Sequence, residues 1–468
     1  MLTLGDILHA LTGYQPAGNE PVVASFVVDS REAGPGSVFV AFAGEKVDGH
    51  AFVADAFGRG AIAALVERAP DGDWPVVDAR DGAAPLPTRL PVVIRVNSTL
   101  HALQAIARAW RARFDVRVIG ITGSVGKTST KELTAAVLSR RYRTLKSPGN
   151  QNNEIGVPLT LLNLRPEHER AVIEMGMYAQ GEIDTLCDLA RPSVGVVTMI
   201  GPVHLERLGS MEAIVAAKRE LVVALPEDGT AVLNKDDERV MSMAAYTQAR
   251  VFTYGLDPSA DLWADSIETM GLDGLRFTLH HRRERLTVRV PLLGRHNVHT
   301  ALRAVAVGLI EGVRWDEIIA GLNASAAQLR LVVSDGPRDS LIIDDTYNSS
   351  PDSALAALNL LADLNGRRIA VLGDMLELGQ AERQGHRVVG RRAADVADIL
   401  ITVGTRARTI GAEALALGRP ADQVLMVDDA PAAVPLLEEL IAAGDVILVK
   451  GSLGMRMDRI VTALGRLD

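Results

Sequence analysis

Short apolar runs alternate with longer amphipathic stretches along most of the chain. Runs such as 116–122, 169–175 and 194–200 predict buried strands, and the stretches between them predict helices. Strands that alternate with helices imply a parallel sheet with right-handed crossovers. Between 251 and 290 the pattern changes to paired alternating runs typical of hairpins. The pattern therefore predicts an α/β protein.

The same pattern divides the 468 residues into three segments. At roughly 150 residues per domain, the length also predicts about three domains. Residues 1–97 mix short strands and helices, with a Pro- and Gly-rich loop region near their end. Residues 98–330 carry the central parallel sheet, and residues 331–468 contain strand-like runs separated by helices. The last segment is expected to form a doubly wound, Rossmann-like domain.

Composition narrows the class of protein. The hydrophobic fraction is 48% and the aromatic fraction only 4%, so the cores must be built from Ala, Val, Leu and Ile. A net charge of −9 argues against a broad nucleic-acid surface. No apolar run reaches the roughly 18 residues of a membrane span. The N-terminal stretch lacks a basic segment and a cleavage site, and it predicts a short amphipathic helix ending at Gly13. We expect a soluble, cytoplasmic protein with no membrane partner.

Cys187 is the only cysteine, which excludes an intrachain disulfide and favours a reducing compartment. It lies in a helical stretch without neighbouring basic groups that would lower the pKa of a thiol. The pattern favours an inert packed thiol over a nucleophile.

The strongest local signal is a glycine-rich turn between a buried strand and a helix, at 119–133. Gly123 and Gly126 would let the backbone wrap phosphate oxygens, Lys127 could reach the β- and γ-phosphates, and the Thr128 hydroxyl suits Mg²⁺. The general phosphate-loop pattern has Gly or Ala where this chain has Ile121. The alternative is an ordinary strand-to-helix turn.

Three chemically suitable residues follow later strands or lie on a later helix. In open α/β sheets, ligands bind at the carboxyl ends of strands. Glu174 ends one strand and could hold a cation, although a solvated carboxylate is the alternative. His204 taken alone is equally consistent with a hydrogen-bonded loop imidazole. Lys218 taken alone would be a surface lysine.

Several motifs together change these expectations. TGSVGKTS at 122–129, GNQNNEIGVP at 149–158, AVIEMGM at 171–177, IGPVHLE at 200–206 and GDMLELG at 373–379 resemble the Mur ligases, and the resemblance covers nearly the whole chain in order. The second and last of these motifs are typical of the branch that joins D-alanyl-D-alanine to UDP-N-acetylmuramoyl-tripeptide. The resemblance implies a protein of three domains. It also implies an ATP-dependent reaction that forms a peptide bond through an acyl-phosphate intermediate and yields the peptidoglycan precursor.

The resemblance also implies roles for individual residues. The ATP phosphates would be bound by Gly123, Ser124, Val125, Gly126, Lys127, Thr128 and Ser129. Thr128 and Glu174 would hold one Mg²⁺, and His204 would help to hold a second. The family's lysine at the position of Lys218 is carbamylated, which turns an ammonium into a carboxylate-like ligand.

Substrate contacts follow from the same resemblance. Asn297 matches an adenine-side contact, Arg330 a hinge arginine near the phosphates, and Asp345 a ribose contact. The family's motif beside the uridine of the substrate matches Asp29, Ser30 and Arg31. Its loop close to the muramoyl-peptide matches Asn152 and Asn153. A monomer is expected.

One motif departs from the family pattern. Ser349 and Ser350 stand where Ala and Asn are usual, and Thr346 replaces a serine. These changes could alter contacts to the incoming dipeptide. Two alternatives remain: a related ligase that extends UDP-muramoyl-dipeptide or folate, and a nucleotide-binding switch without ligase activity.

Overall fold

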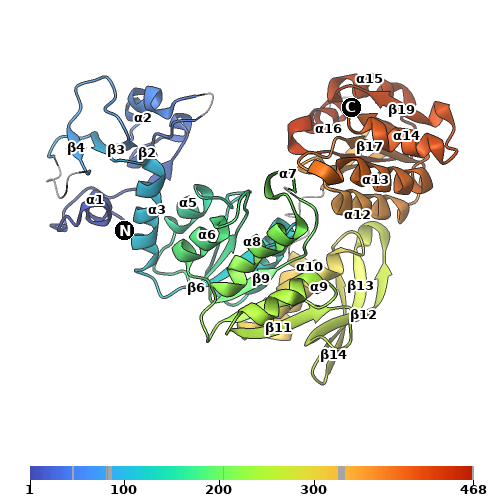
Figure 1. Ribbon diagram of the computed structural model, residues 1–468, viewed down its shortest axis with the longest axis horizontal. Coiled ribbons are helices and arrows are strands. Elements are labelled where there is room, and N and C mark those ends of the chain that lie inside the picture. Colours follow the sequence, from blue (N-terminus) through green and yellow to red (C-terminus); the bar gives the residue numbers. More distant parts are fainter. Residues whose placement is uncertain (45–46, 81, 83–86, 204, 325–331, 466–468) are drawn as a thin grey trace. The chain divides into compact units, whose positions relative to one another are not determined.

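The computed structural model describes residues 1–44, 47–80, 82, 87–203, 205–324 and 332–465. They form two compact units. The first contains Met1–Gly120, Tyr142–Gly176 and Glu182–Ser193, and the second contains Ile121–Arg141, Met177–Gly181 and Val194–Asp468. The described strands form sheets of five, nine and six strands, most of them parallel (Figure 1). The expected α/β class, with three sheets and a doubly wound C-terminal sheet, is confirmed.

The five-stranded sheet lies in the first unit and is entirely parallel, in the order β1-β2-β3-β5-β4. Its strands are β1 Ser25–Val27, β2 Ser37–Val40, β3 Ala63–Val66, β4 Val76–Asp78 and β5 Val92–Arg95. Helix α1 (Leu4–Thr12) starts at a capping box between Thr3 and Asp6 and ends at Gly13, whose φ of 77° places it in the left-handed region. The short helix expected at this end of the chain is confirmed.

The first unit also holds elements that flank or belong to the nine-stranded sheet. They are α3 Thr99–Arg111, β7 Thr144–Lys146, α5 Gly156–Leu161, β8 Arg170–Glu174 and α6 Glu182–Ala190, whereas α2 (Val53–Gly58) packs on the five-stranded sheet. Cys187 is buried on α6, with Sγ 3.8 Å from the sulfur of Met175. The expected packed position of this thiol is confirmed.

The nine-stranded sheet has the order β14-β13-β12-β11-β10-β9-β6-β8-β7. Its strand β6 (Arg117–Thr122) leads into the second unit, which continues with α4 Lys127–Leu138, β9 Val194–Val197, α7 Leu205–Leu208, α8 Met211–Val223, β10 Thr230–Asn234, α9 Glu238–Met241, β11 Arg250–Gly255, β12 Leu262–Thr269, β13 Leu275–His281, β14 Glu284–Val290, α10 Asn297–Ile310 and α11 Trp315–Ala324. Strands β12, β13 and β14 are antiparallel, as the hairpin pattern predicts. Helices α10 and α11 pack against α4.

The six-stranded sheet has the order β15-β16-β20-β17-β18-β19. Its elements are β15 Val332–Gly336, β16 Ser340–Asp345, α12 Pro351–Ala362, β17 Arg368–Gly373, α13 Glu382–Val396, β18 Ile399–Val403, α14 Arg408–Ala416, β19 Val424–Val427, α15 Ala430–Leu440, β20 Val446–Lys450 and α16 Asp458–Leu464. Successive residues of β17 face opposite sides, so Ala370 packs in the core with α12 and α13, and Ile369 in the core with α15 and α16. The sequence pattern missed β15, because this antiparallel edge strand is short and largely exposed.

Candidate functional site

The glycine-rich turn forms a loop between β6 and α4. Gly126 precedes the helix with a φ of 84°, and Gly123 has a φ of 138°. A Cβ atom at Gly123 would lie 1.9 Å from Oγ1 of Thr198, so a larger residue cannot occupy this position unless Thr198 moves. Both glycines therefore have backbone conformations that favour glycine, as the tight turn expected from the sequence requires.

The segment after β9 fixes the conformation of this loop. The N–H of Ser124 donates to the carbonyl of Met199 at 2.8 Å, and the Ser124 hydroxyl donates to the carbonyl of Gly201 at 3.0 Å while accepting from its N–H at 2.9 Å. Thr198 Oγ1 donates to the carbonyl of Val125 at 2.6 Å. These hydrogen bonds hold the loop at the N-terminal end of α4, and the N-terminus of a helix favours binding of an anion.

Lys127, at the start of α4, bends back over the loop. Its Nζ donates to the carbonyls of Gly123 at 2.9 Å and Ser124 at 3.3 Å. Thr128 and Ser129 follow in the first helical turn. A cation and several helix N-terminal groups therefore meet at one short loop, an arrangement that can bind a polyphosphate.

Lys218 lies in the middle of α8, which starts at the cap residue Ser210. Only 1% of Lys218 is exposed. The expectation that this lysine, taken alone, lies on the surface is therefore wrong. The burial comes from tertiary packing, and a buried ammonium must be paired or chemically neutralised.

Glu174 ends β8 in the first unit and is fully buried. The side-chain amide of Asn152 donates to its Oε1 at 2.8 Å, and the Glu174 N–H donates to Ser147 Oγ at 3.1 Å. The alternative of a solvated strand-end carboxylate is wrong. Asn153 has a local role, because its Oδ1 accepts from the N–H groups of Ile155 at 3.2 Å and Gly156 at 2.8 Å at the start of α5.

Asp29, Ser30 and Arg31 form one tight turn after β1. Asp29 accepts the N–H of Arg31 at 2.9 Å and pairs with its guanidinium at 2.5 Å. Hydrogen bonds from the Arg31 side chain and backbone lower the pKa of Asp29 to about 2. Ser30 is buried, whereas the Arg31 side chain is 81% exposed. The turn therefore presents an ion pair between Asp29 and Arg31 at the surface of the first unit.

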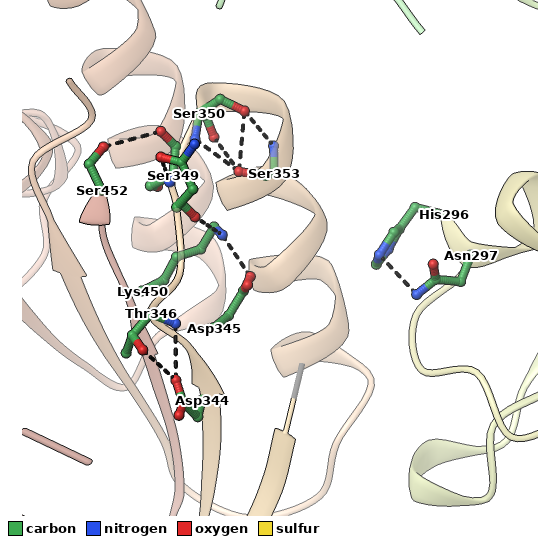
Figure 2. A network of polar contacts seen from close by, with 11 residues as sticks. His296, Asn297, Asp344, Asp345, Thr346, Ser349, Ser350, Ser353, Lys450 and Ser452 are labelled. Carbon is green, nitrogen blue, oxygen red and sulfur yellow. Dashed lines mark hydrogen bonds and ion pairs between the residues drawn. The ribbon is translucent and has the colours of Figure 1, made fainter. Parts of the chain in front are cut away.

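A polar network joins the carboxyl ends of β16 and β20 (Figure 2). Asp345 and Lys450 are neighbours in register on these strands. Lys450 is 2% exposed, and its Nζ donates to Asp345 Oδ2 at 2.7 Å and to the carbonyl of Asn348 at 2.8 Å. The ion pair fixes the orientation of the Asp345 carboxylate. Sequence reasoning missed Lys450, although the Lys-Gly-Ser run after the last strand marks it.

The serines that replace the usual Ala and Asn belong to the same network. Ser350 caps α12 through a capping box with Ser353. Ser452 Oγ donates to the carbonyl of Ser349 at 3.4 Å (Figure 2). It also accepts the N–H of Leu376 at 2.9 Å. Thr346 donates to Asp344 Oδ1 at 2.7 Å. These hydroxyls are engaged in holding the loop after β16.

Asn297 is the first residue of α10. Its Nδ2 donates to the carbonyl of Leu293 at 2.7 Å, and its Oδ1 accepts from Thr300 Oγ1 at 3.0 Å. Two of the expected site residues, His204 and Arg330, lie outside the described residues. Within the described part of the chain, no three His, Cys, Asp or Glu side chains are grouped closely enough to hold a metal ion, and no helix is long and apolar enough to cross a membrane.

Family models match most of the chain. Residues 23–111 match the Mur ligase family catalytic domain, residues 121–308 the Mur ligase middle domain, and residues 329–453 the Mur ligase glutamate ligase domain. A protein of Synechocystis named UDP-N-acetylmuramoyl-tripeptide–D-alanyl-D-alanine ligase is 36% identical to this chain, over 94% of the chain and 92% of that protein.

Solved structures agree with the sequence relatives. MurF of Acinetobacter baumannii has a TM-score of 0.84 and 32% identity, with 98% of both chains covered. MurF ligase of Thermotoga maritima in complex with ADP has a TM-score of 0.78 and 27% identity, covering 95% of this chain and 97% of that chain. The matched models, the relatives and the fold agree along almost the full length, and the chain belongs to the Mur ligase family.

Proposed function

We propose that this protein joins D-alanyl-D-alanine to UDP-N-acetylmuramoyl-tripeptide with hydrolysis of ATP. The observation that carries the proposal is the loop between β6 and α4, in which Lys127 lies over Gly123. Relatives that share about a third of the sequence bear the name of this activity. A solved relative binds ADP, which supports ATP as the nucleotide.

The proposed reaction has two steps. A carboxylate oxygen of the tripeptide attacks the γ-phosphorus of ATP, the bond to the β-phosphate oxygen breaks, and ADP leaves. The amine of the dipeptide then attacks the acyl carbon, loses a proton and expels phosphate. Lys127 stabilises the charge that develops on the transferred phosphoryl group, and the loop amides orient it. Because an acyl phosphate hydrolyses readily, the site must exclude water at this stage.

Mg²⁺ fits the donors that the family resemblance implies. The hydroxyl of Thr128 and the buried carboxylate of Glu174 are hard oxygen donors of the type that Mg²⁺ prefers. Bound Mg²⁺ would neutralise phosphate charge and align the reacting groups. Lys218 as an ammonium would repel a cation, whereas its carbamate would supply an oxygen ligand. We therefore propose that Lys218 is carbamylated, and that His204 is a further ligand of the second ion.

The remaining assignments are part of the same proposal. Asn297 would contact adenine, Asp345 the ribose, and Arg330 the phosphates at a hinge between residues 98–330 and 331–468. The fixed orientation of the Asp345 carboxylate suits a ribose hydroxyl. Residues 1–97 would bind the UDP part of the substrate through Asp29, Ser30 and Arg31. Asn152 and Asn153 would lie close to the muramoyl-peptide, with the protein acting as a monomer.

The test is phosphate release from ATP and Mg²⁺ with UDP-N-acetylmuramoyl-tripeptide present and D-alanyl-D-alanine added or withheld. We expect release that depends on both substrates and a pentapeptide product identified by its mass. Lys127→Ala should abolish turnover while the protein keeps its melting temperature. Near-normal turnover of that variant would refute the mechanism.

The same assay separates the alternatives. Release that is independent of either substrate would indicate a nucleotide switch. Extension of UDP-muramoyl-dipeptide or folate in place of the tripeptide would indicate a related ligase.

A further inference from the structure

One face of α10 carries a chain of hydrogen bonds that leads toward the phosphate loop. Arg303 Nη2 donates to Thr300 Oγ1 at 2.9 Å, and Thr300 Oγ1 donates to Asn297 Oδ1 at 3.0 Å. The three residues are spaced at i, i+3 and i+6, so they lie along one side of the helix over a rise of about 9 Å. Asn297 stands at the helix start, and Arg303 lies nearly two turns further on.

The guanidinium at the far end of this chain lies beside the loop. A Cβ atom built on Gly126 would lie 3.2 Å from Arg303 Nη2. Gly126 precedes Lys127, the first residue of α4. Arg303 therefore brings a second positive charge to the loop, from an element distant in sequence.

Arg303 is buried without a counter-ion. It is 5% exposed and forms no ion pair with any residue that the structure describes. Its buried Nε has no hydrogen-bond acceptor. The other contacts are neutral and long: Nη1 is 3.5 Å from the carbonyl of Thr198 and 3.4 Å from the Tyr254 hydroxyl, and Cζ is 5.8 Å from the centre of the Tyr254 ring.

A desolvated cation without a carboxylate partner is costly in the ligand-free protein. The cost is offset when an anion arrives beside it. The anion expected next to Gly126 is the phosphate chain of a nucleotide. Burial of the charge also strengthens its interaction with such an anion, because water screens it little.

We infer that Arg303 is a nucleotide-binding residue, which pairs with the phosphate chain of ATP beside Lys127 and is oriented by Thr300. This inference rests on the proposed nucleotide site and adds a residue to it that the sequence motifs do not mark. Through Thr300 and Asn297, the same face of α10 would serve the adenine side and the phosphate side of one nucleotide.

The test measures binding of three probes, ADP, tripolyphosphate and adenosine, to the full-length protein by calorimetry. Arg303→Met should weaken ADP and tripolyphosphate by about tenfold or more, on the scale of one lost charge-assisted contact, and leave adenosine unchanged. Arg303→Lys should recover part of the loss. The matched control is Arg295→Met, which removes an exposed arginine near the same helix start and should change none of the affinities.

Ligand-free stability separates phosphate binding from simple bracing of the loop. Because the lost charge has no counter-ion, the melting temperature of ligand-free Arg303→Met should equal or exceed that of the parent protein. A lower melting temperature of Arg303→Met with unchanged affinity for ADP and tripolyphosphate would overturn the inference. A parent protein that binds neither ADP nor tripolyphosphate would also overturn it. If the Met variant does not fold, Arg303→Gln and Arg303→Lys supply the comparison, and equal tripolyphosphate affinity in the two would overturn it. ADP binding without ligation would refute the proposed function and leave this inference standing.

Discussion

Buried lysines distinguish this molecule at the scale of single residues. Three lysines are at most 2% exposed: Lys131, Lys218 and Lys450. Lys450 is neutralised by Asp345, and Lys131 lies 3.1 Å from a carboxylate oxygen of Glu132. Each charge removed from water needs such compensation. For Lys218, carbamylation would replace the ammonium by an anion suited to a metal site.

Replacement of Lys218 tests that chemistry. Lys218→Ala should lower turnover by about 100-fold or more, as when one group that stabilises transition-state charge is lost. Propionate should restore part of the rate, because a short acid can occupy the vacated volume and supply the missing carboxylate. The rate of the parent protein should also fall in CO₂-depleted buffer.

The matched spectroscopic measurement is carbon NMR with labelled bicarbonate. A carbamate signal should appear in the parent protein and be absent from Lys218→Ala. Full activity without CO₂, together with no carbamate signal, would contradict carbamylation.

Sequence reasoning at this scale succeeded where the signal is local. The turn at Gly123 and Gly126 and the helix start at Lys127 could be predicted because a strand, two glycines and a helix start lie within a few residues. The contact of Glu174 with Asn152 joins residues 22 apart, and that of Arg303 with Tyr254 joins residues 49 apart. No local pattern specifies such pairs, because they depend on which strands and helices become neighbours.

At the scale of elements, α13 and α14 are joined by a charged clamp. Glu413 on α14 accepts from Arg387 at 2.7 Å and from Arg391 at 2.8 Å, both on α13. Hydrogen bonds from the two arginines lower the pKa of Glu413 from 4.5 to about 2. The two helices cover part of one face of the C-terminal sheet. The clamp should therefore contribute to the stability of that layer.

The lowered pKa predicts a pH dependence. A carboxyl group with a lower pKa in the folded state stabilises the protein fully above its unfolded pKa, and this contribution is lost as pH falls through the folded pKa. Glu413→Gln should therefore lower the melting temperature at pH 6 to 7, and the difference from the parent protein should shrink between about pH 4.5 and 2.

Exposed Glu227, in the loop between α8 and β10, provides the control. Glu227→Gln should leave the melting temperature unchanged over the same range. A Glu413→Gln difference that stays constant with pH would show that the clamp acts by packing and not by charge.

At the scale of the whole molecule, ligand binding should be visible as stability. A ligand at about 100 times its Kd stabilises the folded state by roughly 2.7 kcal/mol. ADP with Mg²⁺ should therefore raise the melting temperature of the transition that involves the second unit, which contains the loop at 123–129.

Chelation of the metal tests the proposed donors. EDTA should remove most of the ADP-dependent shift and abolish turnover, because the phosphate charge would then no longer be neutralised by the metal. Added Mg²⁺ should restore both. Turnover that survives chelation would argue against metal at Thr128 and Glu174.

The fold class, the α1 cap at Gly13 and the glycine-rich turn between β6 and α4 were determined by the sequence alone, because hydrophobic period, helix caps and glycine dihedrals depend on neighbours along the chain. Tertiary structure decided the rest of the site. The order of the six-stranded sheet brings Asp345 beside Lys450, 105 residues away. Packing buries Lys218 on α8 and directs Arg303 to Gly126. Such positions depend on which elements pack together, and therefore on the free energy of the whole folded chain.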